Sequence, residues 1–186
     1  YLPLLGVGQI QIKGCEADDL IYNIQKILIS LENEVVIATT DADFFQLVKE
    51  GCSIYHLSKE KLYDTNAAME EYGVLPHQWV DYRAMMGDKS DNIDGVRGIG
   101  PKKAADILSK FSSLEKYLHY VNIVNPFWLK GKEAKKHHKD LVENFNTVSR
   151  NRKLMDLEHL PADQVPQEEL ELQLEAAVSL SVDREA

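Results

Sequence analysis

One stretch decides the fold of this 186-residue chain: Gly95-Val96-Arg97-Gly98-Ile99-Gly100-Pro101-Lys102-Lys103-Ala104-Ala105. Its glycines permit a tight turn with positive φ, and the proline suits the first position of a helix. The amides of Gly98 and Gly100, at the N-terminus of that helix, would seat a phosphate group beside Lys102 and Lys103. Such a seat binds a nucleic-acid backbone without reading bases, so its affinity should be insensitive to sequence and sensitive to salt. The alternative is a helix-helix turn that contacts nothing outside the protein.

The distribution of charge singles out the same part of the chain. The formal net charge is −9. Residues 1–93 hold 7 Lys and Arg against 15 Asp and Glu, a balance of −8, and residues 154–186 hold 1 against 9, also −8. Residues 94–153 hold 13 against 6, a balance of +7. Only this middle third is suited to bind phosphate.

A second basic run, residues 130–139, follows the hairpin. Its lysines could follow a duplex backbone downstream of the hairpin, and a solvated helix face is an equal alternative. The predicted contacts to nucleic acid are Arg97, Gly98, Gly100, Lys102, Lys103, Lys135 and Lys136. The pair His137-His138 is expected to be surface decoration, because adjacent positions on a helix cannot present two imidazoles to one ion.

The first third of the sequence predicts an α/β layer. Apolar residues recur at helical spacing over residues 16–31. The β-branched run within 34–39 predicts a buried strand, and 53–57 a second one, with a short helix at about 44–48 between them. The order helix, strand, helix, strand indicates a parallel sheet.

From Thr65 onward the pattern predicts helices only, at about 65–72, 77–86, 101–110, 112–120, 132–144 and 168–177. Residues 87–100 are predicted to be loop and 160–166 a linker. We therefore expect three regions: an α/β metal-binding core at 1–64, a helical region at 65–153, and a closing segment with an acidic tail at 154–186. The tail is expected to be a surface helix.

Three acidic clusters stand at the ends of these elements: Glu16, Asp18 and Asp19; Asp41 and Asp43; Asp88 and Asp91. Carboxylates at the C-terminal end of a strand lie where α/β proteins build their sites. Seven of them brought together would repel one another unless cations bind, and Mg²⁺ prefers such oxygen ligands. Taken singly, each cluster has a plain alternative, since acids commonly cap helices and turns.

The order of these motifs resembles the 5′ nuclease superfamily, which includes the 5′→3′ exonuclease domain of bacterial DNA polymerase I, phage 5′ exonucleases and flap endonucleases. The resemblance rests on Glu16-Ala17-Asp18-Asp19, Asp41-x-Asp43-x-x-Gln46-Leu47 and Gly87-Asp88-x-Ser90-Asp91-Asn92-Ile93, followed by the hairpin glycines. A weaker similarity begins at Asn151-Arg152-Lys153-Leu154. The resemblance implies a PIN-like, partly parallel sheet with helices, followed by a helical region with a helix-hairpin-helix variant.

By that resemblance the acidic residues are both catalytic and metal-binding. Glu16 and Asp18 would hold a first Mg²⁺, with Asp19 near or between two sites, and Asp41, Asp43, Asp88 and Asp91 would hold a second, with Mn²⁺ as a substitute. Hairpin carbonyls would bind K⁺. The implied reaction is hydrolysis of DNA phosphodiesters at 5′ flaps, nicks and duplex ends in replication and repair.

The family also has an N-terminal segment with two further metal-binding aspartates, a basic residue and a helical arch, and none of it can be placed in these residues. Such a segment is expected in the same chain or as a separate polypeptide. The rival hypothesis is a non-catalytic DNA-binding subunit, although such a subunit has no reason to keep mutually repelling acids beside DNA. A nuclease of this fold that acts on RNA is a third hypothesis.

Compartment and packing follow from other residues. The chain has two cysteines, Cys15 and Cys52, and no run of apolar residues long enough to span a bilayer, so a reducing cytoplasm without membrane contact is expected. The family resemblance implies that this is a bacterial or phage-infected bacterial cytoplasm. Both thiols are expected to be buried or half-buried. The tyrosines and tryptophans are expected to pack the core or a groove.

Overall fold

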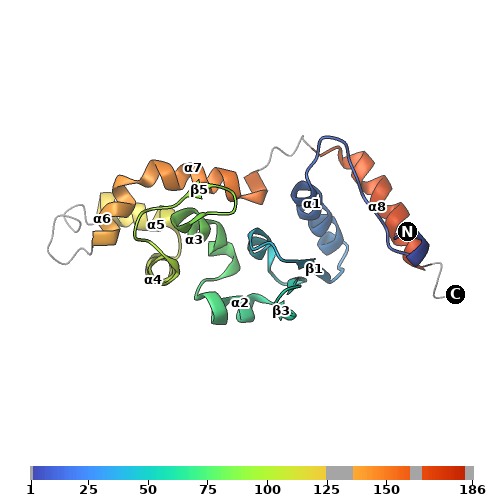
Figure 1. The fold of residues 1–186 in the computed structure, drawn as a ribbon, viewed down its shortest axis with the longest axis horizontal. Helices are drawn as coiled ribbons and strands as arrows, with labels where there is room; N and C mark the ends of the chain where they lie inside the picture. Colours follow the sequence, from blue (N-terminus) through green and yellow to red (C-terminus); the bar gives the residue numbers. More distant parts are fainter. Residues whose placement is uncertain (1, 125–135, 160–164, 183–186) are drawn as a thin grey trace. The chain divides into compact units, whose positions relative to one another are not determined.

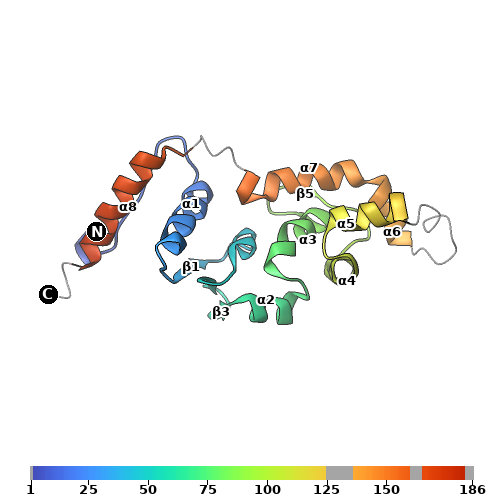
Figure 2. The ribbon, with the colours of Figure 1, turned by 180° about the vertical axis from the view of Figure 1, so that it is seen from behind.

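The structure, a computed structural model, describes residues 2–124, 136–159 and 165–182. The chain forms two compact units, one of residues 1–35 with 157–186 and one of residues 36–156. Figure 1 and Figure 2 show the elements of both units from opposite sides. The sequence predicted three regions, with boundaries after residues 64 and 153, and that division stays a prediction.

The smaller unit is built on helix α1 (Ala17–Ser30) and helix α8 (Gln167–Val182), with short helices η1 (Pro3–Leu5) and η6 (Leu157–His159). Ile12, Leu20 and Leu170 are buried together. An extended segment lies along α8, where Gln11 N donates to Gln173 Oε1 at 2.9 Å and Gln173 Nε2 donates back to Gln11 O at 3.1 Å. The acidic tail is thus a largely exposed surface helix, as predicted.

The larger unit begins with a three-stranded sheet in the order β1 (Val35–Thr39), β2 (Cys52–His56), β3 (Lys61–Tyr63). β2 and β3 are antiparallel. Leu57 N, just past β2, donates to Thr39 O at the end of β1, so these two strands run in the same direction. The partly parallel α/β fold is therefore confirmed, with an antiparallel third strand that the sequence did not indicate.

An aromatic cluster forms the core beneath this sheet. The Phe45 ring, from the 3₁₀ helix η2 (Asp43–Leu47), lies 5.0 Å from Tyr63 and 4.9 Å from Trp79. Tyr72 from α2 (Thr65–Tyr72) and Tyr82 join the same cluster. The prediction that these rings pack the interior is confirmed for this group.

Most of the other described residues of the larger unit are helical. They form η3 (Pro76–Gln78), α3 (Trp79–Met86), α4 (Pro101–Phe111), α5 (Leu114–His119), the π-helix η4 (Tyr120–Val124), α6 (Lys136–Glu143) and α7 (Phe145–Met155). α7 packs along α3, and the two lie side by side in both views. Between α3 and α4 the chain forms an antiparallel pair, β4 (Gly87–Asp88) and β5 (Ile93–Asp94).

Several predictions of local structure were wrong. The region after Thr65 is not helical throughout, because β4 and β5 pair within the predicted loop. The strand at 34–39 is only partly buried, since Val36 is 57% exposed while Ile37 is buried. Helix α7 was not predicted, and the short helix after β1 is a 3₁₀ helix.

Other expectations concern burial and membranes. Cys52 is buried and Cys15 half-buried, as predicted. Among the described residues, no helix is both long and apolar enough to span a bilayer.

Candidate metal centre and nucleic-acid interface

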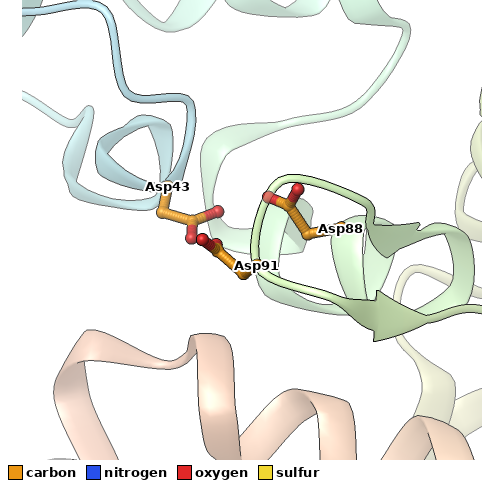
Figure 3. A group of neighbouring side chains, drawn as sticks. All are labelled: Asp43, Asp88 and Asp91. Carbon is orange, nitrogen blue, oxygen red and sulfur yellow. The ribbon is translucent and has the colours of Figure 1, made fainter.

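Three of the predicted carboxylates meet in the larger unit. Asp43, Asp88 and Asp91 each offer an oxygen atom, and the three oxygens lie within 4.8 Å of one another. Figure 3 shows Asp43 reaching from η2 toward Asp88, at the end of β4, and Asp91, on the loop between β4 and β5. An all-oxygen group at this spacing has the chemistry that Mg²⁺ and Mn²⁺ prefer.

Local structure brings these carboxylates together. Asp43 follows β1 by a turn in which Thr39 Oγ1 accepts from Asp41 N at 2.9 Å. Asp88 is the last residue of β4, and its Oδ1 accepts from Ser90 N at 2.8 Å, which tightens the loop. Asp91 follows at the exposed tip of that loop.

A guanidinium group lies against the cluster. Arg83, on α3, donates from Nε to Asp43 Oδ1 at 3.1 Å and from its terminal nitrogen to Asp88 Oδ2. The Arg83 side chain is 16% exposed and that of Asp88 8%. Because buried carboxylates need a counter-charge, Arg83 neutralises part of the cluster in the metal-free protein.

The two carboxyls that share Arg83 titrate in opposite directions. Burial raises the pKa of Asp43 from 3.8 to about 6, and the neighbouring Asp41 charge adds to the rise, while Arg83 opposes it. Burial also acts to raise the pKa of Asp88, but hydrogen bonds from Ser90 and the charge of Arg83 outweigh it and leave that pKa lowered. Asp88 accepts two hydrogen bonds from Ser90 that Asp43 lacks, which accounts for the difference.

Asp41 lies beside this triad with a different role. Its Oδ1 accepts from Asp43 N at 2.8 Å, so the carboxylate closes the turn that leads into η2. The side chain is exposed. The structure therefore supports a turn-forming role for Asp41 and leaves its predicted place in the metal site as a proposal.

The first acidic cluster belongs to the smaller unit, at the start of α1. Asp19 is buried, and its Oδ2 accepts from Glu16 N at 2.9 Å, which caps the helix. Glu16 is exposed and Asp18 half-buried. These three residues thus belong to a different unit from the triad.

The hairpin has the predicted turn and helix. Gly98 has φ +81°, where a side chain would strain the backbone, and open space lies over both Gly98 and Gly100. Pro101 begins α4 and Gly100 is its N-cap. Lys102 and Lys103 are exposed, and Lys103 Nζ donates to Gly98 O at 2.7 Å.

Gly95 serves close packing instead of a positive φ. A Cβ at Gly95 would lie 2.0 Å from Met86 O. This glycine lets the hairpin begin in direct contact with the end of α3.

A pocket of about 640 Å³ lies beside the hairpin. It is lined by Arg97, Gly98, Lys103, Lys136, Asp140 and Asn144. Four predicted DNA contacts thus line one pocket: Arg97, Gly98 and Lys103 from the hairpin region and Lys136 from α6. Lys135 lies outside the described residues.

His138 departs from prediction. It is buried and stacks on Tyr117, with ring centroids 5.7 Å apart. It is a core residue and not surface decoration.

Three residues of this region were not predicted from sequence: Arg83, Ser90 and Asn151. Arg83 is one of only seven basic residues in the acidic first half, which was a usable signal. Asn151 is fully buried on α7 and hydrogen-bonds near the β4–β5 pair. Its position at the head of the weaker sequence similarity was the only sign of a role.

Comparison with curated proteins finds bacterial relatives. The chain is 39% identical to the thermostable DNA polymerase I of Thermus thermophilus over 140 aligned residues. This alignment covers 75% of this chain and 16% of the polymerase. It is 36% identical to a protein named 5′-3′ exonuclease from Buchnera aphidicola over 114 aligned residues. That alignment covers 61% of this chain and 40% of the Buchnera protein. The chain thus spans less than half the length of these relatives.

Solved structures of a phage nuclease share the fold. T5 5′-exonuclease with bound zinc ions matches with a TM-score of 0.73 and 27% identity, over 92% of this chain and 62% of that one. A complex of T5 flap endonuclease with DNA and metal ions matches with a TM-score of 0.72 and 25% identity, over the same shares.

Two family models divide the sequence between them. One, described as a 5′-3′ exonuclease N-terminal resolvase-like domain, matches residues 1–73. The other, described as a 5′-3′ exonuclease C-terminal SAM fold, matches residues 74–177. With these matches across both units, the chain belongs to the 5′-3′ exonuclease family.

Proposed function

We propose that the chain is part of a divalent-metal-dependent 5′ nuclease that hydrolyses DNA phosphodiesters at 5′ flaps, nicks and duplex ends in replication and repair. The observation that carries the proposal is the meeting of Asp43, Asp88 and Asp91 in the same unit as an exposed basic hairpin. A DNA-binding subunit without catalysis gains nothing from such a group of acids. The names of the polymerase, exonuclease and flap endonuclease relatives support the same activity.

The donor set fits a hard divalent ion. Asp43, Asp88 and Asp91 would hold one Mg²⁺ with Asp41 close by, and Glu16, Asp18 and Asp19 are proposed to contribute to a second. Bound ions of this kind stabilise charge on the attacking and leaving oxygens of a phosphodiester. Mn²⁺, which accepts the same ligands, should substitute.

The protein's own groups prepare the site and hold the substrate. Arg83 keeps Asp43 and Asp88 close together before metal binds. The open hairpin backbone at Gly98 and Gly100, with Lys102 and Lys103, is proposed to hold a duplex phosphate. Arg97 and Lys136, which line the adjoining pocket, extend this surface, and Lys135 is proposed to continue it.

The proposal also includes a K⁺ ion at the hairpin carbonyls and a location in the bacterial cytoplasm. Gly98 O already accepts from the Lys103 ammonium group, which supports a cation-binding role for the hairpin carbonyls and our assignment of K⁺ there. The bacterial and phage sources of the relatives support a bacterial cytoplasm.

The test compares Asp91→Asn with Asp94→Asn, an exposed aspartate three positions further along that is not in the triad. Asp91→Asn should weaken Mn²⁺ binding by roughly tenfold or more in titration calorimetry, whereas Asp94→Asn should not. Any product that the wild-type chain forms from a 5′-labelled flap with Mg²⁺ should be missing with Asp91→Asn. A wild-type chain that binds the flap but no Mn²⁺ would be the non-catalytic DNA-binding subunit instead.

A further inference from the structure

Asn151 is a buried amide whose hydrogen bonds all reach the backbone or a neighbouring side chain. It is 0% exposed on α7. Its Nδ2 donates to Ala84 O at 3.0 Å and to Asp94 O at 2.8 Å. Its Oδ1 accepts from the Arg150 guanidinium at 3.0 Å, which fixes the orientation of the amide.

The first acceptor belongs to the last turn of α3, where carbonyls have no partner inside the helix. Gly87 N donates to Arg83 O, and Val96 N donates to Met85 O at 2.9 Å. Asn151 takes Ala84 O, the carbonyl between them. After the helix's own last bond, to Arg83 O, the next two carbonyls are thereby bonded to two other segments, α7 and the start of the hairpin.

The second acceptor lies on the far side of the acidic loop. Gly87 pairs with Asp94, and Asp88 with Ile93, so β4 and β5 enclose a loop that Asp88 begins and that carries Asp91. Asn151 bonds to the helix that leads into this loop and to the strand that leaves it. One side chain therefore holds both ends of the loop.

Helix α7 is itself firmly anchored to α3. Arg152 Nε lies 2.9 Å from Asp81 Oδ1, and Val148 and Met155 are buried. The amide of Asn151 thus projects from a fixed platform.

We infer that Asn151 is a positioning residue that sets Asp88 and Asp91 relative to Asp43. It does not belong to the triad itself. Without its two donors, two carbonyls near the loop ends lose their bonds and the loop can open, which separates the carboxylates. This inference rests on the proposed function, because the loop matters through the ion that its carboxylates hold.

The experiment compares Asn151→Leu, which keeps the branched shape without the donors, with a matched control. Gln78 is a buried amide in the same unit, and its Nε2 donates to Leu108 O and Ser112 O, away from the acidic loop. Gln78→Met should lower the melting temperature but leave the loop unchanged. Asn151→Ser, which keeps one donor, replaces the leucine variant if that variant does not fold.

Two readouts are measured on folded protein. For Asn151→Leu the Mn²⁺ dissociation constant should rise roughly tenfold, and for Gln78→Met it should stay within about twofold of wild type. Backbone amides in residues 87–96 should exchange hydrogen faster in Asn151→Leu than in Gln78→Met at equal global stability.

The inference is overturned if folded Asn151→Leu matches the control in Mn²⁺ affinity or in loop exchange. If wild type binds no Mn²⁺, the proposed metal site fails. Hydrogen exchange then still decides whether Asn151 holds the loop.

Discussion

At the scale of single residues, the metal-free site is a balance between repelling carboxylates and one arginine. Arg83 contacts Asp43 and Asp88 at once. The Asp43 carboxyl nevertheless keeps a raised pKa of about 6, because burial and Asp41 outweigh the arginine. A proton and a divalent ion would therefore compete for Asp43 near pH 6.

This competition predicts a pH dependence. A raised pKa means that Asp43 carries a proton below about pH 6 in the metal-free protein. Apparent Mn²⁺ affinity should consequently fall as the pH is lowered from about 7.5 to about 5, and the slope should be smaller in Asp43→Asn, which cannot release a proton. Calorimetry at fixed ionic strength measures both.

The contribution of Asp43 to the stability of the metal-free fold should depend on pH in the opposite direction to the Mn²⁺ affinity. A carboxyl whose folded pKa is raised contributes stability below its unfolded pKa, and this contribution is lost as the pH rises through about 6. Equal melting-temperature differences between wild type and Asp43→Asn at about pH 4 and about pH 7 would contradict the raised pKa.

At the scale of elements, the hairpin and α4 form a basic surface on which two of the three lysines of α4 already have partners within the protein. Lys103 bonds Gly98 O, and Lys110, near the end of the same helix, pairs with Asp106 at 2.8 Å. Lys102 and Lys103 lie in the first turn, beside the open backbone. Only these two of the three lysines are placed to meet a phosphate at the helix N-terminus.

We therefore expect Lys102→Ala with Lys103→Ala to weaken duplex binding equally for all sequences. The dependence of log K on log salt should become shallower by roughly one to two units. Lys110→Ala is the control on the same helix and should leave the slope unchanged. Fluorescence anisotropy across a salt series measures all three proteins, and an unaltered slope in the double variant would remove the hairpin from the interface.

Elements also show what the sequence could and could not reveal. The hairpin was predictable because glycine and proline act through local φ preferences, and α1 because its apolar period is regular. β4 and β5 have two residues each, too few to form a pattern. The roles of Arg83 and Asn151 depend on partners 40 and 67 positions away, which no local pattern records.

At the scale of the whole molecule, the predicted ligands are shared between two units. Asp43, Asp88 and Asp91 lie in one unit, and Glu16, Asp18 and Asp19 in the other. The family resemblance implies two further aspartates from an N-terminal segment, which stays an expectation. The fraction of the Buchnera exonuclease that the chain covers, 40%, leaves room for such a segment in its relatives.

This division predicts how the 186 residues behave alone. The hairpin and its pocket lie within one unit, so binding of a branched DNA should persist. Hydrolysis needs both ions close to the phosphate, and an ion held by Glu16 and Asp18 without further carboxylates should bind weakly. We therefore expect slow cleavage of a 5′-labelled flap with Mg²⁺ or Mn²⁺, and faster cleavage when the N-terminal part of a related nuclease is added as a separate polypeptide. Adding that part to Asp91→Asn should restore nothing, which separates complementation from activity of the added part. Rapid cleavage by the 186 residues alone would show that the carboxylates within them are sufficient.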